Sequence, residues 1–226
     1  MYRGVIFLDR GFDQGRENLK RIALLTMTVD HIGKVLFPSS IFMRIIGRIS
    51  FPLYSYLLVL GMESTRNVEN YFSRLIVFAI ISQAPFSLTF GYSPLEKLNI
   101  FFTLSLGILT LWKPILVLPS FLIAELLNFD YGAYGIVTIW GMKILKNSDI
   151  TGIITLIFLN AVYIVLSQIQ AFSLLALPLI ILYNKGFFGG VKEIKDEQFY
   201  QPFRRYFFYI YYPLHLLFLY IAKSFV

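Results

Sequence analysis

The sequence predicts an all-α protein, a polytopic transmembrane helix bundle of about nine spans that occupies residues 1–226 as a single domain. Of the 226 residues, 57% are hydrophobic and only 15% are charged, a composition that a water-soluble domain would struggle to bury. Apolar stretches of about 17–25 residues recur along nearly the whole chain, near the length that crosses ~30 Å of hydrocarbon. Cysteine is absent, which excludes a disulfide framework and a thiolate nucleophile.

Breaks in hydropathy place the predicted spans in order along the chain. The fourth and fifth spans are divided at Trp112-Lys113-Pro114, because lysine and proline favour a tight turn at the membrane interface over a helix interior. A short polar link at Ser167-Gln168 divides the seventh from the eighth. The nine predicted spans are 21–37, 43–62, 71–90, 98–112, 114–128, 132–147, 150–166, 168–184 and 203–222.

The distribution of basic residues tests this count independently. With a cytoplasmic N-terminus, the inner segments hold fifteen Lys and Arg residues and the outer segments hold two, Lys97 and Lys223. This asymmetry predicts nine spans with the N-terminus inside and the C-terminus outside. It also accounts for the net charge of +7, so no nucleic-acid partner is needed. The fifteen are Arg3, Arg10, Arg16, Lys20, Arg21, Arg66, Arg74, Lys113, Lys143, Lys146, Lys185, Lys192, Lys195, Arg204 and Arg205.

Two adjacent polar residues, Asp30 and His31, interrupt the first predicted span. A carboxylate in a bilayer costs at least ~2.5–3.5 kcal/mol on insertion scales, so a chain that keeps one there is expected to use it. His31 lies ten residues from Arg21 and His215 lies ten residues from Arg205, roughly 15 Å of helix in each case. Both histidines are therefore predicted near the midplane, with the first, second and ninth spans side by side.

Arg44 and Arg48 share one face of the second span because they are four residues apart. Asp30 is expected to pair with Arg44, Arg48 or Lys34, or to orient a histidine on another helix. His31 points about 100° away from Asp30, so the two neighbours are expected to have different roles. The alternatives are an ion pair that only fixes helix packing and a histidine that only packs.

Several ordered blocks resemble the TraX family of bacterial membrane proteins. They are KRIALLTMTVDHIG at 20–33, RIIGRISFPLYSYLLVLG at 44–61, TRN at 65–67 with Tyr71 and RL at 74–75, LNIFFTL at 98–104, DYGAYG at 130–135 and FYIYYPLHL at 208–216. The resemblance spans essentially the whole chain. It implies a multi-pass protein of the bacterial cytoplasmic membrane that transfers acetyl groups from acetyl-coenzyme A. TraX is known for acetylating the N-terminus of pilin, and it resembles in outline the membrane acyltransferases of surface polysaccharides.

Acyl transfer from a thioester needs a base and donors for the developing oxyanion, and neutral imidazole suits the first task. We therefore expect His31 to act as general base, with His215 as a second catalytic candidate. Asp30 is expected to orient this base or to hold the arginines. Arg44 and Arg48 are expected to bind the oxyanion or a substrate phosphate, because a guanidinium binds such groups bidentately. The acceptor is expected to be an exported peptide, pilin or a surface glycan, and no metal is expected.

Two further groups of residues are assigned by side of the membrane. Coenzyme A is cytoplasmic, so its nucleotide is expected at the inner side, although ordinary anchoring of the helix ends is the better explanation for each of these cations taken singly. The acceptor entrance is expected on the outer side. The inner candidates are Arg66, Asn67, Tyr71, Arg74 and Lys143, with Lys146; the outer candidates are Asn99, Asp130 and Tyr131, with Glu125.

Two other functions fit an intramembrane group of Asp, His and Arg. A small proton-coupled transporter or flippase would use the same residues as a proton relay and substrate gate. A membrane scaffold without catalytic activity would use them for packing alone. Binding of coenzyme A would separate these alternatives from an acetyltransferase.

Overall fold

The computed structural model describes residues 12–165, 167–189, 191–192 and 197–225. This part of the chain is helical apart from one short antiparallel pairing, β1 (Phe12–Asp13) with β2 (Val191–Lys192). The all-α prediction is therefore confirmed, while the strand pairing was not predicted. Arg3, Arg10 and Lys195, which contributed to the predicted cytoplasmic charge, lie outside the described residues.

Each of the nine predicted apolar stretches coincides with one helix or with two short consecutive helices. The division at Trp112-Lys113-Pro114 is confirmed, since one helix ends at Trp112 and the next segment begins at Pro114. The helices are α1 (Gln14–Leu36), α2 (Ile41–Gly47), α3 (Ser50–Ser64), α4 (Val68–Phe90), α5 (Ile100–Trp112), α6 (Val117–Leu126), α7 (Gly132–Asn147), α8 (Asp149–Tyr163), α9 (Ala176–Asn184) and α10 (Glu197–Lys223), with 3-10 turns η1 (Pro114–Leu116) and η2 (Gln168–Leu175).

The second predicted span is interrupted between α2 and α3. Pro52 lies in the first turn of α3, where its missing N–H leaves the carbonyl of Arg48 without the usual helical donor. The helical hydrogen bonding is therefore interrupted at Arg48 and Ile49, just after the end of α2, although both residues keep right-handed helical backbone angles.

Nine full-length membrane crossings are not established by the helix lengths. Among the described residues, two segments are long and apolar enough to cross a membrane, Ile41–Ser64 with 24 residues and Val68–Phe90 with 23. The apolar helix α5 has 13 residues, about 20 Å at ~1.5 Å per residue, which falls short of ~30 Å of hydrocarbon. The outer faces of α6 and α8 nevertheless expose rows of large apolar side chains, including Leu118, Leu122, Ile154 and Phe158, as a lipid-facing surface does.

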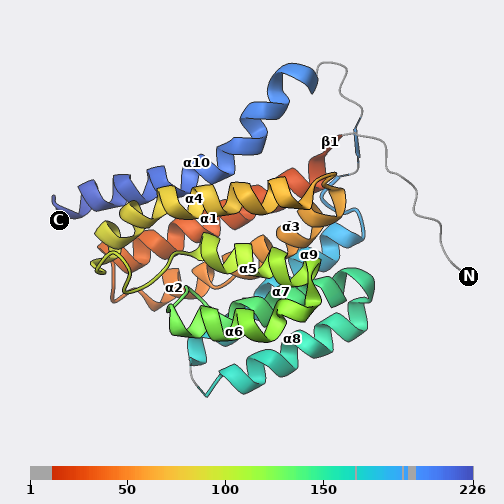
Figure 1. Ribbon diagram of the computed structural model, residues 1–226, viewed down its shortest axis with the longest axis horizontal. Coiled ribbons are helices and arrows are strands. Elements are labelled where there is room, and N and C mark those ends of the chain that lie inside the picture. The colour runs from red at the N-terminus through yellow and green to blue at the C-terminus, as the bar shows by residue number, and fades with distance from the viewer. Residues whose placement is uncertain (1–11, 166, 190, 193–196, 226) are drawn as a thin grey trace, which may run out of the picture.

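Helices α1, α4 and α10 lie side by side at one face of the bundle, and α5, α6, α7 and α8 follow toward the other (Figure 1). Helix α1 also packs against α2 and α3, so the predicted apposition of the first, second and ninth apolar stretches is confirmed. A Cβ atom on Gly47 would collide with the side chain of Asp30. This glycine therefore allows α2 to pass close enough to α1 for Arg44 and Arg48 to reach Asp30.

Candidate functional site

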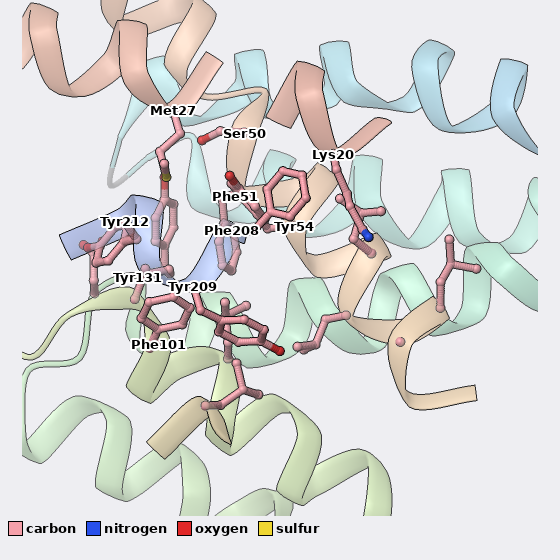
Figure 2. Close-up of a pocket in the computed structure, with 18 of the residues that line it drawn as sticks. Lys20, Met27, Ser50, Phe51, Tyr54, Phe101, Tyr131, Phe208, Tyr209 and Tyr212 are labelled. Carbon is pink, nitrogen blue, oxygen red and sulfur yellow. The ribbon is translucent and has the colours of Figure 1, made fainter. Parts of the chain in front are cut away.

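A cavity of about 1660 Å³ follows α1 along most of its length (Figure 2). Its lining on α1 runs from Arg16 to Lys34, eighteen residues or about 27 Å at ~1.5 Å of helical rise. Pockets for drug-sized ligands usually enclose about 300–1,000 Å³, so this cavity has room for a ligand longer than a typical metabolite. It reaches from the residues near the start of α1 to the Asp30-His31 pair near its end.

The middle of the cavity is lined mainly by aromatic side chains. Phe51, Tyr54, Phe101, Tyr131 and Tyr212 surround it from three different helices and the turn before α7 (Figure 2). Tyr131 has a φ of 66°, an uncommon conformation outside glycine, and its ring stacks on Phe51 with centroids 4.0 Å apart. Charged groups lie at both ends of this aromatic section, which therefore separates two chemically different sites.

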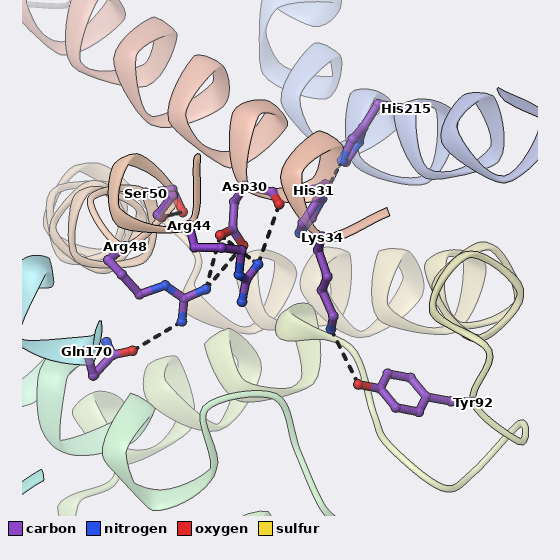
Figure 3. A network of polar contacts seen from close by, with 10 residues as sticks. Asp30, His31, Lys34, Arg44, Arg48, Ser50, Tyr92, Gln170 and His215 are labelled. Atoms are coloured by element: carbon purple, nitrogen blue, oxygen red, sulfur yellow. Dashed lines mark hydrogen bonds and ion pairs between the residues drawn. The ribbon is translucent and has the colours of Figure 1, made fainter. Parts of the chain in front are cut away.

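Asp30 is the centre of an ion-pair network at the end of the cavity reached by Lys34 (Figure 3). Arg44 Nη1 lies 2.8 Å from Asp30 Oδ1, and Arg48 Nη2 lies 3.2 Å from both carboxylate oxygens. The Asp30 side chain is 11% exposed, against 24% for Arg44 and 12% for Arg48. One buried carboxylate thus holds two guanidinium groups, and Arg44 is the more accessible of the two.

The network continues from Arg48 into the middle of the bundle. Arg48 Nη1 donates to Gln170 Oε1 at 3.2 Å, and Gln170 Nε2 donates to the Tyr134 hydroxyl at 3.0 Å. The Arg48 guanidinium also lies 5.8 Å from the Tyr131 ring centroid. Arg48 thus bonds to residues of α1 and η2, while its buried Nε, like those of Arg16 and Arg74, has no hydrogen-bond partner.

His31 forms a hydrogen bond with His215 of α10 (Figure 3). The two rings are parallel to within 3°, and His31 Nδ1 lies 2.7 Å from His215 Nε2. The structure therefore brings the two histidines together, while their depth in the membrane stays a prediction. His31 lines the cavity, whereas His215, 8% exposed, lies behind it.

The hydrogen bonds of His215 determine which nitrogen of His31 carries a proton. His215 Nδ1 lies 2.9 Å from the carbonyl oxygen of Tyr211, which can only accept, so this nitrogen carries the hydrogen. In a neutral ring His215 Nε2 is then an acceptor, and His31 Nδ1 must donate to it. The remaining nitrogen of His31, Nε2, has a free lone pair and no protein partner among the described residues, as a general base requires.

Pairing of Asp30 with Lys34 was one of the predicted alternatives, but Lys34 has other contacts in the structure. Its Nζ lies 3.4 Å from the Tyr92 hydroxyl and 4.0 Å from the centroid of the Phe90 ring. Lys34 therefore lines the same cavity end as His31 without a carboxylate partner among the residues that the structure describes.

At the opposite end, four of the predicted nucleotide-binding residues line the cavity: Arg66, Asn67, Tyr71 and Arg74. Arg16, which the sequence reasoning did not single out, joins them and donates to Ser64 Oγ at 3.1 Å. The Nε atoms of Arg16 and Arg74 are buried and have no hydrogen-bond partner. Each arginine thus keeps unused donor capacity, which is suited to a phosphate.

Four predicted contacts do not line the cavity: Lys143, Lys146, Asn99 and Glu125. Lys143 forms an ion pair with Glu63 at 2.6 Å, which leaves it an anchor at the helix ends. Asn99 is fully buried, where it caps α5 through Phe101 N and donates to the carbonyl of Ala79 at 2.7 Å. Sequence position gives the side of the bundle but not the direction of a side chain, and these side chains make their contacts away from the cavity wall.

The other outer candidates meet at the entrance beyond Arg48. Asp130 forms an ion pair with Lys97 at 3.0 Å, and both residues line the cavity together with Tyr131. Burial disfavours the charged Lys97 amine, but the adjacent Asp130 carboxylate outweighs this and raises the pKa of Lys97 above its ordinary value. Glu125 does not line the cavity and instead accepts from Ala133 N at the start of α7.

The described residues contain no group of three or more His, Asp or Glu side chains placed to hold a metal ion. The sequence reasoning missed Arg16, Gln170 and Lys97 as cavity residues, and it missed Tyr92 as the partner of Lys34. Arg16 and Lys97 were visible only as charges near span ends. Gln170 gave a weaker signal as a polar residue within the predicted eighth span.

The chain is similar to two named proteins and to one protein family. The probable fimbrial assembly protein FimC, serogroup H1, of Dichelobacter nodosus is 25% identical over 259 residues, covering 97% of this chain and 100% of that protein. The uncharacterized protein RP591 of Rickettsia prowazekii (strain Madrid E) is 35% identical over 65 residues, 29% of this chain and 24% of that protein. No solved structure matches the chain. The family described as TraX protein matches residues 15–223, which include both histidines and every cavity-lining residue except Asp13, and the chain therefore belongs to the TraX family.

Proposed function

We propose that this protein is an acetyltransferase of the bacterial cytoplasmic membrane. It moves an acetyl group from cytoplasmic acetyl-coenzyme A to an amine or hydroxyl of an exported peptide, pilin or surface glycan. The observation that carries the proposal is the His31–His215 hydrogen bond, which leaves His31 Nε2 as a free base on the wall of a long cavity. The family and the fimbrial assembly name of one relative support a role at the cell surface.

In the proposed reaction the acceptor nitrogen or oxygen attacks the carbonyl carbon of the thioester. His31 Nε2 takes the proton that this atom loses, and the carbonyl oxygen becomes an oxyanion. The carbon–sulfur bond then breaks, and the coenzyme A thiolate takes the proton back from His31. His215 accepts from His31 Nδ1–H throughout, so it fixes the tautomer and stabilises the imidazolium.

Arg44 is the proposed donor to the oxyanion. Only its Nη1 is used by described residues, in bonds to the side chain and the carbonyl of Asp30. The remaining N–H groups of the guanidinium are free to donate, and arginine stays charged at all relevant pH values. Asp30 therefore positions Arg44, and because it neighbours His31 in sequence it holds the donor close to the base.

The opposite cavity end suits the nucleotide of coenzyme A. Arg16 and Arg74 have buried, unused donors there, and Arg66 and Asn67 lie at the mouth. The aromatic section between the two ends gives the thin pantetheine arm an apolar passage toward His31. This orientation places the nucleotide on the side where the predicted topology puts the cytoplasm.

The test is acetyl transfer by the purified protein in lipid nanodiscs, with radiolabelled acetyl-coenzyme A. Acceptors are a peptide with a free N-terminus and an extract of surface glycans. His31→Ala should reduce transfer at least about 100-fold, the lower range for loss of a general base. Thr26→Val is the matched control, because Thr26 lies on the same helix, bonds only to α1 carbonyls and does not line the cavity.

Transfer that survives in His31→Ala would remove His31 from the mechanism. A wild-type protein that neither binds acetyl-coenzyme A nor transfers label would reject the acetyltransferase. The length of the cavity keeps the transporter as the second candidate, and it predicts substrate flux into liposomes without acetyl-coenzyme A.

A further inference from the structure

We propose that the cavity end around Lys34 binds a negatively charged group of the acceptor, a carboxylate or a phosphate next to its reacting amine or hydroxyl. That the anion belongs to the acceptor rests on the proposed function. The anion site itself rests only on the charged side chains that line the cavity. The structure brings Lys34, Arg44 and His31 to the same cavity end.

Positive charge exceeds negative charge at this end. Four cations line it, and two carboxylates oppose them. Each carboxylate is already paired: Asp30 with two arginines, and Asp130 with the lysine of the loop before α5. This end of the cavity therefore has a surplus of two positive charges, and the side chains that carry them are largely shielded from water. The four cations are Lys34, Arg44, Arg48 and Lys97.

Lys34 carries one of these two surplus charges, and the two arginines that share Asp30 carry the other. An ammonium group has three donors, and Lys34 uses one of them in a long bond of 3.4 Å to the Tyr92 hydroxyl. The Phe90 ring gives it a further cation–π contact at 4.0 Å. Neither contact neutralises the charge, and a charge held in a shielded site is costly without a counter-ion.

The position of Lys34 defines where a ligand's anion would lie. Lys34 follows His31 by three residues, so both project from neighbouring positions on α1, about 4.5 Å apart along the axis. Arg44 adds free guanidinium donors, since described residues use only its Nη1. An anion held between Lys34 and Arg44 would place the attached amine or hydroxyl beside His31, which explains why a base and a cation share this end.

Two features argue that the anion belongs to the acceptor and not to coenzyme A. The arginines with buried, unpartnered Nε atoms near the start of α1 already offer a phosphate site at the other end. The aromatic section separates that site from Lys34. Variants at the two ends therefore distinguish the two assignments.

The experiment measures anion binding without turnover. The thermal unfolding midpoint of the full-length protein in neutral detergent is followed with increasing inorganic phosphate or acetate, against chloride of equal ionic strength. Ligands that bind the folded state raise this midpoint with concentration. We expect a saturable rise in the wild type, and an apparent affinity about tenfold weaker in Lys34→Met, as loss of one charge-assisted hydrogen bond implies. Comparison of phosphate with acetate identifies the preferred anion.

Controls separate this site from general charge effects. Lys113→Met removes the same charge from an exposed lysine outside the cavity and should respond as the wild type does. Lys34→Arg should keep the response, and Arg74→Gln should keep the response to acetate, since phosphate can also bind beside Arg16 and Arg74 at the other end. With acetate, no rise beyond chloride in the wild type, an unchanged rise in Lys34→Met, or loss of the rise in Arg74→Gln would each overturn the proposal.

A transfer assay then connects the site to the acceptor. The bound anion should inhibit transfer competitively against the acceptor and not against acetyl-coenzyme A; competition against acetyl-coenzyme A alone would overturn the assignment. Because the unfolding assay needs no activity, a protein that binds anions at Lys34 but transfers no acetyl group would reject the proposed function and leave the anion site standing.

Discussion

Replacing His215 by alanine removes the acceptor that holds the Nδ1–H group of His31. The hydrogen bond is 2.7 Å long between parallel rings, and it ends on the Tyr211 carbonyl at 2.9 Å, so the whole series is well aligned. When His31 becomes an imidazolium, this bond becomes charge-assisted and is worth about 1.5–3 kcal/mol. At ~1.36 kcal/mol per factor of ten, kcat should fall about 10- to 150-fold.

The KM for acetyl-coenzyme A should stay unchanged in this variant, because His215 does not line the cavity. His215→Gln should recover much of the lost rate, since its side-chain oxygen also accepts from His31 Nδ1–H, whereas His215→Phe fills the space without an acceptor. Single-turnover transfer of radiolabelled acetyl separates the chemical step from product release. A kcat within about twofold of the wild type in both alanine and phenylalanine variants would refute the proposed role of His215.

Three further predictions address the ion pairs, the donor site and the topology. Asp30→Asn leaves two largely buried guanidinium groups without a carboxylate and should lower the free energy of unfolding by about 3 kcal/mol, measured by denaturant unfolding in detergent; an unchanged midpoint would show that the network is dispensable. Arg74→Gln should weaken acetyl-coenzyme A binding about tenfold in calorimetry while the KM for the acceptor stays constant, and the reverse pattern would place the nucleotide elsewhere. The chain lacks cysteine, so single cysteines at Lys97 and Lys113 can be labelled from either side of sealed vesicles; labelling from the same side would contradict the predicted topology.

The helix-forming stretches followed directly from hydropathy. Each of the nine predicted stretches is helical, and the turn at Lys113-Pro114 lies where proline chemistry placed it. The internal divisions were less visible, because the break at Arg48 depends on a missing N–H four residues later, at Pro52. Several of the apolar helices are short or are broken by 3-10 turns, so their lengths do not establish that each one crosses the membrane. The nine crossings therefore stay a prediction.

The candidate site was predictable by residue type and by depth. The cost of a charge in a bilayer marked Asp30, His31, Arg44 and Arg48, and counting from the basic helix ends placed His215 level with His31. The structure joins these residues by two ion pairs and one hydrogen bond between the histidines.

Hydropathy, charge and local periodicity are properties of the chain read in order, and they are enough to give the helical architecture and the polar residues that are expensive to bury. Partners between helices depend on how each helix is rotated about its axis, which is a property of packing. Only the tertiary structure could therefore show that Asp30 pairs with the two arginines and not with Lys34. It alone could also show that Asn99 and Lys143 do not line the cavity. The same packing turned the two histidines toward each other and left Lys34 beside them without a carboxylate partner among the described residues.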